Sequence, residues 1–188
     1  MSEQFGDLVM VEVGRVLFPG TFMGVPVDGP RKAVMPRAGA SVIAALSSTD
    51  IGVRALVESV RGLDSDDASG LTVIGLCGIR RVRIEQRRAG LVSGAIADPV
   101  GRGKGVQVER TVAALRQYLA ALAERGHEAD VMVEIPAEPL AASYRVASLL
   151  RISAQEQQHL LEAPDAYERL AALEGVLGRE RRLLEATT

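Results

Sequence analysis

The sequence is poor in aromatic residues and in cysteine. Its 188 residues include no tryptophan, three phenylalanines, three tyrosines and one cysteine, Cys77. A single cysteine excludes a disulfide within the chain and fits a reducing compartment. Because apolar residues make up 47% of the chain while aromatic rings are scarce, the core must be built from valine, leucine, isoleucine and alanine.

Long hydrophobic runs are also missing. No stretch approaches the roughly 18 consecutive apolar residues that indicate a membrane-spanning helix. The first ten residues, MSEQFGDLVM, lack the basic and apolar segments of an export signal. We therefore expect a cytoplasmic protein with no membrane partner.

Residues that carry catalysis or bind metals are few and scattered. The chain has two lysines, Lys32 and Lys104, and two histidines, His127 and His159. Their positions, taken with Cys77, match no serine–lysine dyad, cysteine nucleophile or zinc site. Cys77 lies in an apolar run, which predicts a buried structural residue. The sequence therefore predicts neither an enzyme nor a bound metal.

One glycine-rich segment, 101–105, resembles a phosphate-binding loop at first sight. In such a loop the Gly-Lys pair is followed by serine or threonine, whereas Gly103-Lys104 is followed by Gly105. We interpret the segment as a turn between two domains and expect no cofactor.

Charge argues against a general polyanion-binding protein, since the formal net charge is −2. One local cluster is basic and lies on a predicted strand: Arg80, Arg81, Arg83, Arg87 and Arg88. RNA-binding surfaces usually add aromatic side chains that stack on bases, and this segment has none. A solvated strand face with Glu58 and Glu85 as counter-charges is the favoured interpretation, and an RNA-binding surface is the alternative.

The first half of the chain shows the short apolar runs of β-strands. We predict strands at 8–13, 22–27, 51–60, 71–77, 78–84 and 91–96, whereas 41–46 fits either a strand or a helical turn. Alternation places Ile51, Val53, Ala55 and Val57 on one face, and it separates Val82 and Ile84 from Arg81 and Arg83. Polar, glycine-bounded segments at 61–70 and 87–90 predict hairpin turns.

The second half shows the period of helices. Val108, Val112, Leu115, Leu119 and Leu122 form one stripe, and Gly126 ends that helix. Further helices are predicted at 139–150, after a capping box formed by Ser153 and Glu156, and from Pro164 to Ala186. The stripe of the last helix is Tyr167, Leu170, Leu173, Leu177 and Leu184. The change of period predicts an α+β protein with a β-rich domain at 1–106 and an all-α, four-helix bundle-like region at 107–188.

The segment VLFPG at 16–20 closes the first apolar run. Proline and glycine at the centre of Phe18-Pro19-Gly20-Thr21 suit a type II turn. With apolar residues on both sides, the segment predicts a buried, hairpin-like corner.

Three segments in this order resemble the N-terminal substrate-binding domain of the Lon ATP-dependent proteases. The segment at 16–20 is similar to the family's VLFPG signature, Pro30-Arg31 to the end of its EPR(Y) motif, and GIRRVRI at 78–84 to its GxRRFRI strand. Residues 149–170 resemble its helical region in layout. The resemblance spans about residues 8–186. It implies a PUA-like β-barrel followed by helices, without the ATPase and Ser–Lys peptidase modules of full Lon proteases.

The function implied is non-enzymatic binding of unfolded or apolar polypeptide segments by the β-rich half. Phe18, Phe22 and Met23 are the candidate contacts, because large apolar side chains beside a Pro-Gly turn can be partly exposed and methionine adapts to varied partners. A place in the core is the favoured interpretation for each. Expected partners are unfolded or misfolded protein segments and a separate protease or chaperone. The alternative is an RNA-binding PUA-like module that uses Arg80 to Arg88, by analogy of fold.

Overall fold

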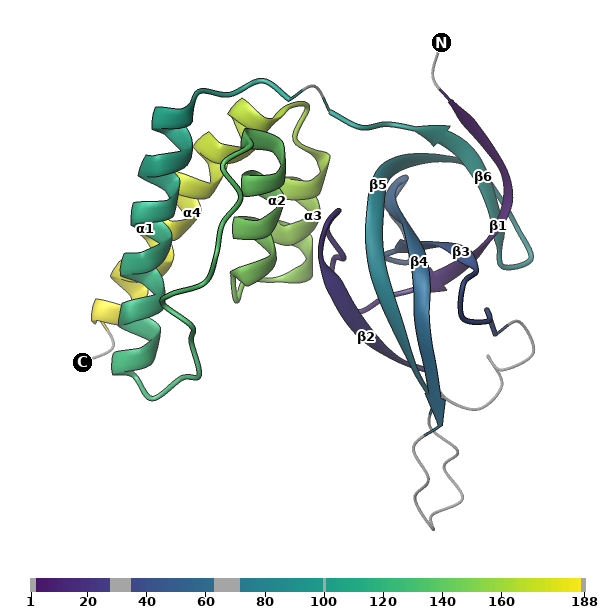
Figure 1. The fold of residues 1–188 in the computed structure, drawn as a ribbon, viewed down its shortest axis with the longest axis horizontal. Coiled ribbons are helices and arrows are strands. Elements are labelled where there is room, and N and C mark those ends of the chain that lie inside the picture. Colours follow the sequence, from purple (N-terminus) through teal and green to yellow (C-terminus); the bar gives the residue numbers. More distant parts are fainter. Residues whose placement is uncertain (1–2, 28–34, 63–71, 100, 187–188) are drawn as a thin grey trace. The chain divides into compact units, whose positions relative to one another are not determined.

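The chain is organised as two compact units, Met1–Asp98 and Pro99–Thr188. The computed structural model describes residues 3–27, 35–62, 72–99 and 101–186. The first unit is built of strands and the second of helices (Figure 1), which confirms the predicted α+β class. The units divide before the glycine-rich segment 101–105, whereas the sequence pattern places the division after it, between residues 106 and 107.

The β unit contains a six-stranded sheet. In chain order its strands are β1 (Gln4–Glu12), β2 (Phe22–Val27), β3 (Ser41–Ala45), β4 (Ile51–Gly62), β5 (Thr72–Arg88) and β6 (Leu91–Ile96). The segment 41–46, which fitted two interpretations, is a strand. The predicted loop at 61–70 and the Pro30-Arg31 motif lie largely or wholly outside the described residues.

The sheet closes on itself through β5. Its order is β2-β5-β4-β3-β1-β6, and β6 pairs with β5 as well as with β1. β5 has 17 residues, and this length lets it pair with three strands. It pairs with β2 from Thr72 to Cys77, with β4 from Thr72 to Arg83, and with β6 from Val82 to Arg88. All pairs are antiparallel except β1 with β3. The closed sheet resembles a β-barrel, and its closure leaves few free strand edges.

The predicted strands at 71–77 and 78–84 form one continuous strand. Gly78, at the boundary between the two predictions, lies against the turn at Phe18. A Cβ atom at Gly78 would lie 2.3 Å from the Phe18 carbonyl oxygen. The glycine therefore permits a close approach of two backbones and does not end the strand.

The predicted turn at Phe18–Thr21 is confirmed. The prediction that it joins two paired strands, as in a hairpin, is wrong. Thr21 N–H donates to the Phe18 carbonyl at 3.1 Å, and Gly20 has a φ of 74°. The turn packs on β5, since Gly78 N–H donates to the Thr21 carbonyl at 2.9 Å. β1 pairs with β3 and β6, and β2 pairs with β5. The turn therefore connects two parts of the sheet that are not neighbours.

The core of the β unit is aliphatic, as the composition predicts. One cluster consists of Ile43, Ala45, Val82, Ile84 and Val92, with Phe5, Leu8, Met10 and Ile96 packed against it. The predicted inward face of β4 is confirmed, because Ile51, Val53, Ala55 and Val57 are all buried.

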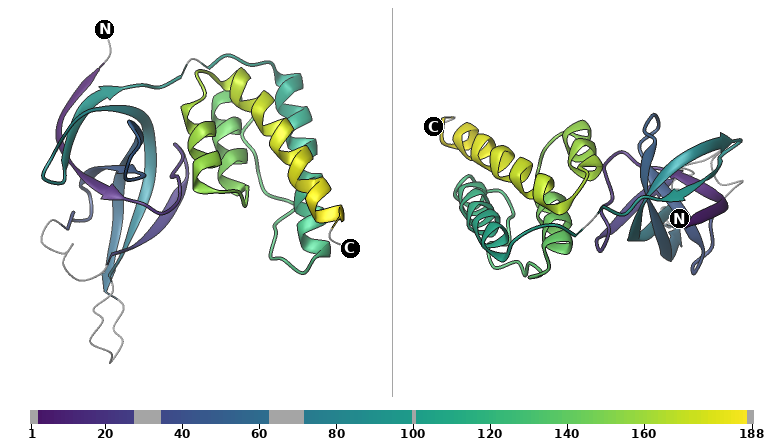
Figure 2. Two further views of the ribbon diagram at one scale, coloured as in Figure 1. Left: turned by 180° about the vertical axis from the view of Figure 1, so that it is seen from behind. Right: turned by 90° about the horizontal axis from the view of Figure 1, so that it is seen from above.

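The helical unit contains α1 (Gly105–Glu124), α2 (Pro139–Leu149), α3 (Ala154–Glu162) and α4 (Ala166–Ala186). The long helices α1 and α4 run parallel, since Arg110 pairs with Glu174 and Gln117 bonds with Arg181. Figure 2 shows the two helices side by side. Within the described residues, no helix combines the length and the hydropathy needed to cross a membrane.

The predicted stripe of α4 is partly wrong. Leu170, Leu173 and Leu177 are buried, but Tyr167 is exposed and Arg169 takes an inward position. The Arg169 guanidinium donates from Nε to the Leu160 carbonyl at 2.6 Å and from Nη2 to the Ala163 carbonyl at 3.1 Å. These groups lie at the end of α3, whose last carbonyls have no partner within the helix. Apolarity alone cannot predict this role for an arginine.

The capping box at the start of α3 is confirmed. Glu156 N–H donates to Ser153 Oγ at 3.2 Å, and the Glu156 carboxylate accepts from the Ser153 backbone N–H at 3.2 Å. The same carboxylate accepts from the Ser153 hydroxyl at 2.8 Å and from Arg179 at 2.5 Å. These contacts, the two with Ser153 first and then Arg179, hold the pKa of Glu156 below its ordinary value.

We predict that Ser153→Ala raises the pKa of Glu156 toward that of an ordinary glutamate. Because the folded pKa lies below the unfolded one, the carboxylate stabilises the fold above the unfolded pKa. This stabilisation is lost as the pH falls through the folded pKa. An NMR titration of the Glu156 carboxyl carbon measures the change, with Ser148→Ala in α2 as the control. An unchanged pKa in Ser153→Ala would contradict the assignment.

Candidate functional site

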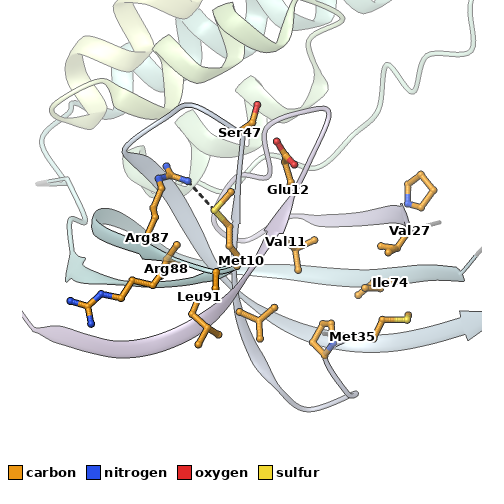
Figure 3. A pocket seen from close by; sticks show the side chains of 16 residues that line it. Met10, Val11, Glu12, Val27, Met35, Ser47, Ile74, Arg87, Arg88 and Leu91 are labelled. Atoms are coloured by element: carbon orange, nitrogen blue, oxygen red, sulfur yellow. Dashed lines mark hydrogen bonds between the residues drawn. The ribbon is translucent and has the colours of Figure 1, made fainter. Parts of the chain in front are cut away.

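The β unit contains a pocket with a volume of about 470 Å³. Its wall comes from β1, the end of β2, residues 35–36, and the hairpin of β5 and β6 (Figure 3). The lining is mainly apolar and includes Met10, Val11, Val27, Met35, Ile74 and Leu91. A concave apolar surface of this size is typical of a binding site.

The hairpin of β5 and β6 forms one side of the pocket. Its turn residues, Ala89 and Gly90, have φ values of 46° and 86°, the left-handed pair that joins two antiparallel strands through two residues. Met10 N–H donates to the Gly90 carbonyl at 2.9 Å, which ties β1 to the turn. The turn is therefore shorter than the predicted turn at 87–90 and consists of Ala89 and Gly90, because β5 continues through Arg88.

Two arginines lie at the rim of the pocket. Arg87 donates from Nη1 to the Met10 sulfur at 2.9 Å and from Nη2 to the Thr49 carbonyl. Figure 3 shows the Arg87 guanidinium beside Met10, whereas the Arg88 side chain runs in a different direction from that of Arg87. Across the described part of the chain, neither arginine forms an ion pair with a carboxylate.

The three predicted polypeptide contacts lie outside the pocket, and one of them is inaccessible. Phe18 is completely buried, so the interpretation that places it in the core holds, and the alternative that it contacts a polypeptide does not. Its ring belongs to the corner that packs on β5. Phe22 is 62% exposed, and its ring lies over Gly75, where a Cβ atom would be 2.9 Å away. Met23 is half-buried.

Three large apolar side chains of the β unit are exposed in the described residues: Phe22, Val60 and Ile79. They lie on β2, β4 and β5. Ile79 is the extra residue of a bulge, because Gly78 is opposite Ala55 and Arg80 is opposite Arg54. Cys77 is opposite Phe22 in the sheet. It is half-buried and therefore less buried than the sequence predicted.

The structure divides the predicted basic patch. Arg80 pairs with Asp98 at 2.7 Å and with Glu3 at 3.2 Å, so the expected counter-charges Glu58 and Glu85 are not the ones it uses. The hydrogen bond with Asp98, followed by the charge of Asp98, raises the pKa of Arg80 above its ordinary value. The positive charge of Arg80 is therefore compensated locally.

Arg81 lies inside instead of on the solvent face. It is 8% exposed and donates from Nε to the Ala97 carbonyl at 2.6 Å. The predicted alternation holds for Val82 and Ile84, which are buried, and for Arg83, which is exposed. Arg81 is buried because Ala97 and Asp98 cover it: its backbone N–H also donates to Asp98 Oδ1 at 3.0 Å. Arg83, Arg87 and Arg88 remain exposed, and in the described residues none of them stacks on an aromatic ring. This arrangement gives little support to RNA binding.

No signal in the sequence marks the pocket. Met10, Val27, Met35 and Leu91 lie far apart in the chain and come together only when the sheet closes. In the described ranges, no group of three or more histidine, cysteine, aspartate or glutamate side chains could hold a metal ion. The pocket can therefore offer apolar contact and positive charge.

The fold is thus of the α+β class, with a closed sheet that contains an apolar pocket and with a separate helical unit. The model of the family described as ATP-dependent protease La (LON) substrate-binding domain matches residues 8–179. The chain belongs to this family, and the resemblance found in its motifs is confirmed.

Solved structures share the fold, and two of them illustrate the similarity to this chain. The crystal structure of a Lon N-terminal domain protein from Xanthomonas campestris has a TM-score of 0.62 and 21% identity, and the match covers 90% of this chain and 97% of that one. The N-terminal domain of the Mycobacterium avium complex Lon protease has a TM-score of 0.67 and 20% identity, with 92% and 98% covered. Comparison with curated proteins found no match.

We predict that the two phenylalanines at the turn contribute very differently to the free energy of unfolding. Phe18→Ala removes a completely buried ring and should lower the free energy of unfolding by about 3 to 5 kcal/mol. Phe22→Ala, its matched control, should cost about 1 kcal/mol or less because the ring is largely exposed. Urea denaturation followed by circular dichroism measures both. Equal losses would contradict the placement of the two rings.

Proposed function

We propose that the chain is a non-enzymatic, cytoplasmic module that binds unfolded, apolar polypeptide segments. The observation that carries the proposal is the apolar pocket of the β unit, in a member of a substrate-binding family. Binding requires no covalent step. A separate protease or chaperone would act on the captured segment.

The chemistry of the pocket suits varied apolar side chains. Two of its lining residues are methionines, Met10 and Met35, whose unbranched side chains adapt to ligands of different shape. Full burial of one large aliphatic or aromatic side chain contributes about 1.5 to 3 kcal/mol. Burial of one such side chain, here called the anchor, therefore gives weak binding. A folded protein buries such side chains in its own core, so few of them are available to the pocket.

The exposed ring of Phe22 can extend the contact. Phe22 lies on β2, and the far end of the same strand, at Pro26 and Val27, lines the pocket. An extended client that follows β2 would touch the ring and place another side chain in the pocket. Of the predicted contacts, Phe22 and Met23 thus remain candidates, and Phe18 does not.

The test is a titration with a permanently unfolded protein whose disulfides are reduced and blocked. Because the chain has no tryptophan, the tryptophan fluorescence of the client reports binding without background. We expect saturable binding to the unfolded form and at least tenfold weaker binding to the folded form. Equal affinity for both forms, or no binding to either, would overturn the proposal.

Leu91→Gln should weaken binding of the unfolded client about fivefold. The change removes part of the apolar lining, and a loss of about 1 kcal/mol corresponds to that factor. Leu183→Gln is the matched control, because Leu183 lies on α4, outside the pocket, and is 56% exposed. Equal effects of the two changes would show that the pocket is not the site.

A further inference from the structure

The described residues that line the pocket carry a net positive charge. Arg87 and Arg88 line the pocket together with one acidic residue, Glu12. The Arg87 guanidinium is held by uncharged groups, the Met10 sulfur and the Thr49 carbonyl. Those contacts fix its position without neutralising its charge.

We propose that the pocket selects apolar polypeptide segments that carry acidic residues beside the apolar anchor. The inference deepens the proposed function and rests on it. The anchor fills the apolar part of the pocket, between Met10, Met35 and Leu91. Carboxylates on either side of the anchor then lie near Arg87 and Arg88.

The geometry of the two arginines favours several carboxylates over a single anion. Arg87 and Arg88 are neighbours in β5, and successive side chains of a strand point to opposite sides. Figure 3 shows the two side chains diverging. One carboxylate therefore cannot bind both guanidinium groups, which argues against a chain terminus or a fatty acid as the occupant. A segment with spaced acidic side chains can reach both.

The selectivity from such contacts is modest and depends on salt. An ion pair exposed to solvent changes affinity by a factor of about 1.5 to 5. Two pairs give a combined factor of about 2 to 30. At an ionic strength of about 0.5 M the screening length falls well below 8 Å, so the factor should shrink toward one.

The experiment compares two amidated peptides with one apolar sequence, flanked either by glutamate or by glutamine. By fluorescence anisotropy at low salt, the glutamate peptide should bind the full chain about fivefold more tightly, and the difference should disappear at high salt. Arg88→Gln should reduce the preference to about twofold, and Arg87→Gln should do the same. Arg83→Gln, on the same strand but outside the pocket, is the matched control and should leave the preference unchanged.

The outcomes separate this inference from the proposed function. Equal affinity for the two peptides overturns the acidic preference and leaves apolar binding intact, whereas binding of neither overturns both. A preference that Arg83→Gln removes as fully as Arg88→Gln would overturn the assignment to the pocket. Two further ligands, laurate and the glutamine peptide with a free terminal carboxylate, are measured in the same way. They test whether a ligand with a single carboxylate is the preferred occupant. Tighter binding of either than of the glutamate peptide would overturn the choice of occupant.

Discussion

The structure of the β unit depends on one strand that pairs with three others. β5 pairs with β2 and β4 along its first half and with β6 along its second, where the pairing with β4 ends at Arg83. Closure requires very close backbone approach at two glycines. A Cβ atom at Gly94 would lie 2.0 Å from the Arg83 carbonyl oxygen, and one at Gly78 would lie 2.3 Å from that of Phe18. These contacts fix β6 and the Phe18 turn against the same strand.

The pocket follows from this closure. Once β6 pairs with both β1 and β5, the hairpin at Ala89-Gly90 is brought beside Met10, and apolar residues from distant segments face a common space. The buried ring of Phe18 belongs to the supporting structure, while the exposed ring of Phe22 is available for contact. The family's signature turn thus supports the binding unit, and the site lies elsewhere on it.

Local patterns predicted most elements because their causes are local. The apolar runs at 22–27 and 91–96, the capping box at Ser153 and the end of α1 at Gly126 each depend on a few adjacent residues. The failures have distant causes. Ala97 and Asp98 cover Arg81, Arg169 donates to carbonyls at the end of another helix, and β1 and β2 pair with strands other than each other. The pocket was missed for the same reason.

The central claim, that apolar segments bind in the pocket of the β unit, is tested most directly by methyl NMR of labelled methionines. The chain has five methionines, of which Met10 and Met35 line the pocket. Met132, in the helical unit and 84% exposed, is an internal control for unspecific adhesion. On addition of an unfolded apolar peptide, we predict saturable shifts of the Met10 and Met35 methyl signals and none at Met132. Shifts at Met132 with unmoved Met10 and Met35 would contradict the claim.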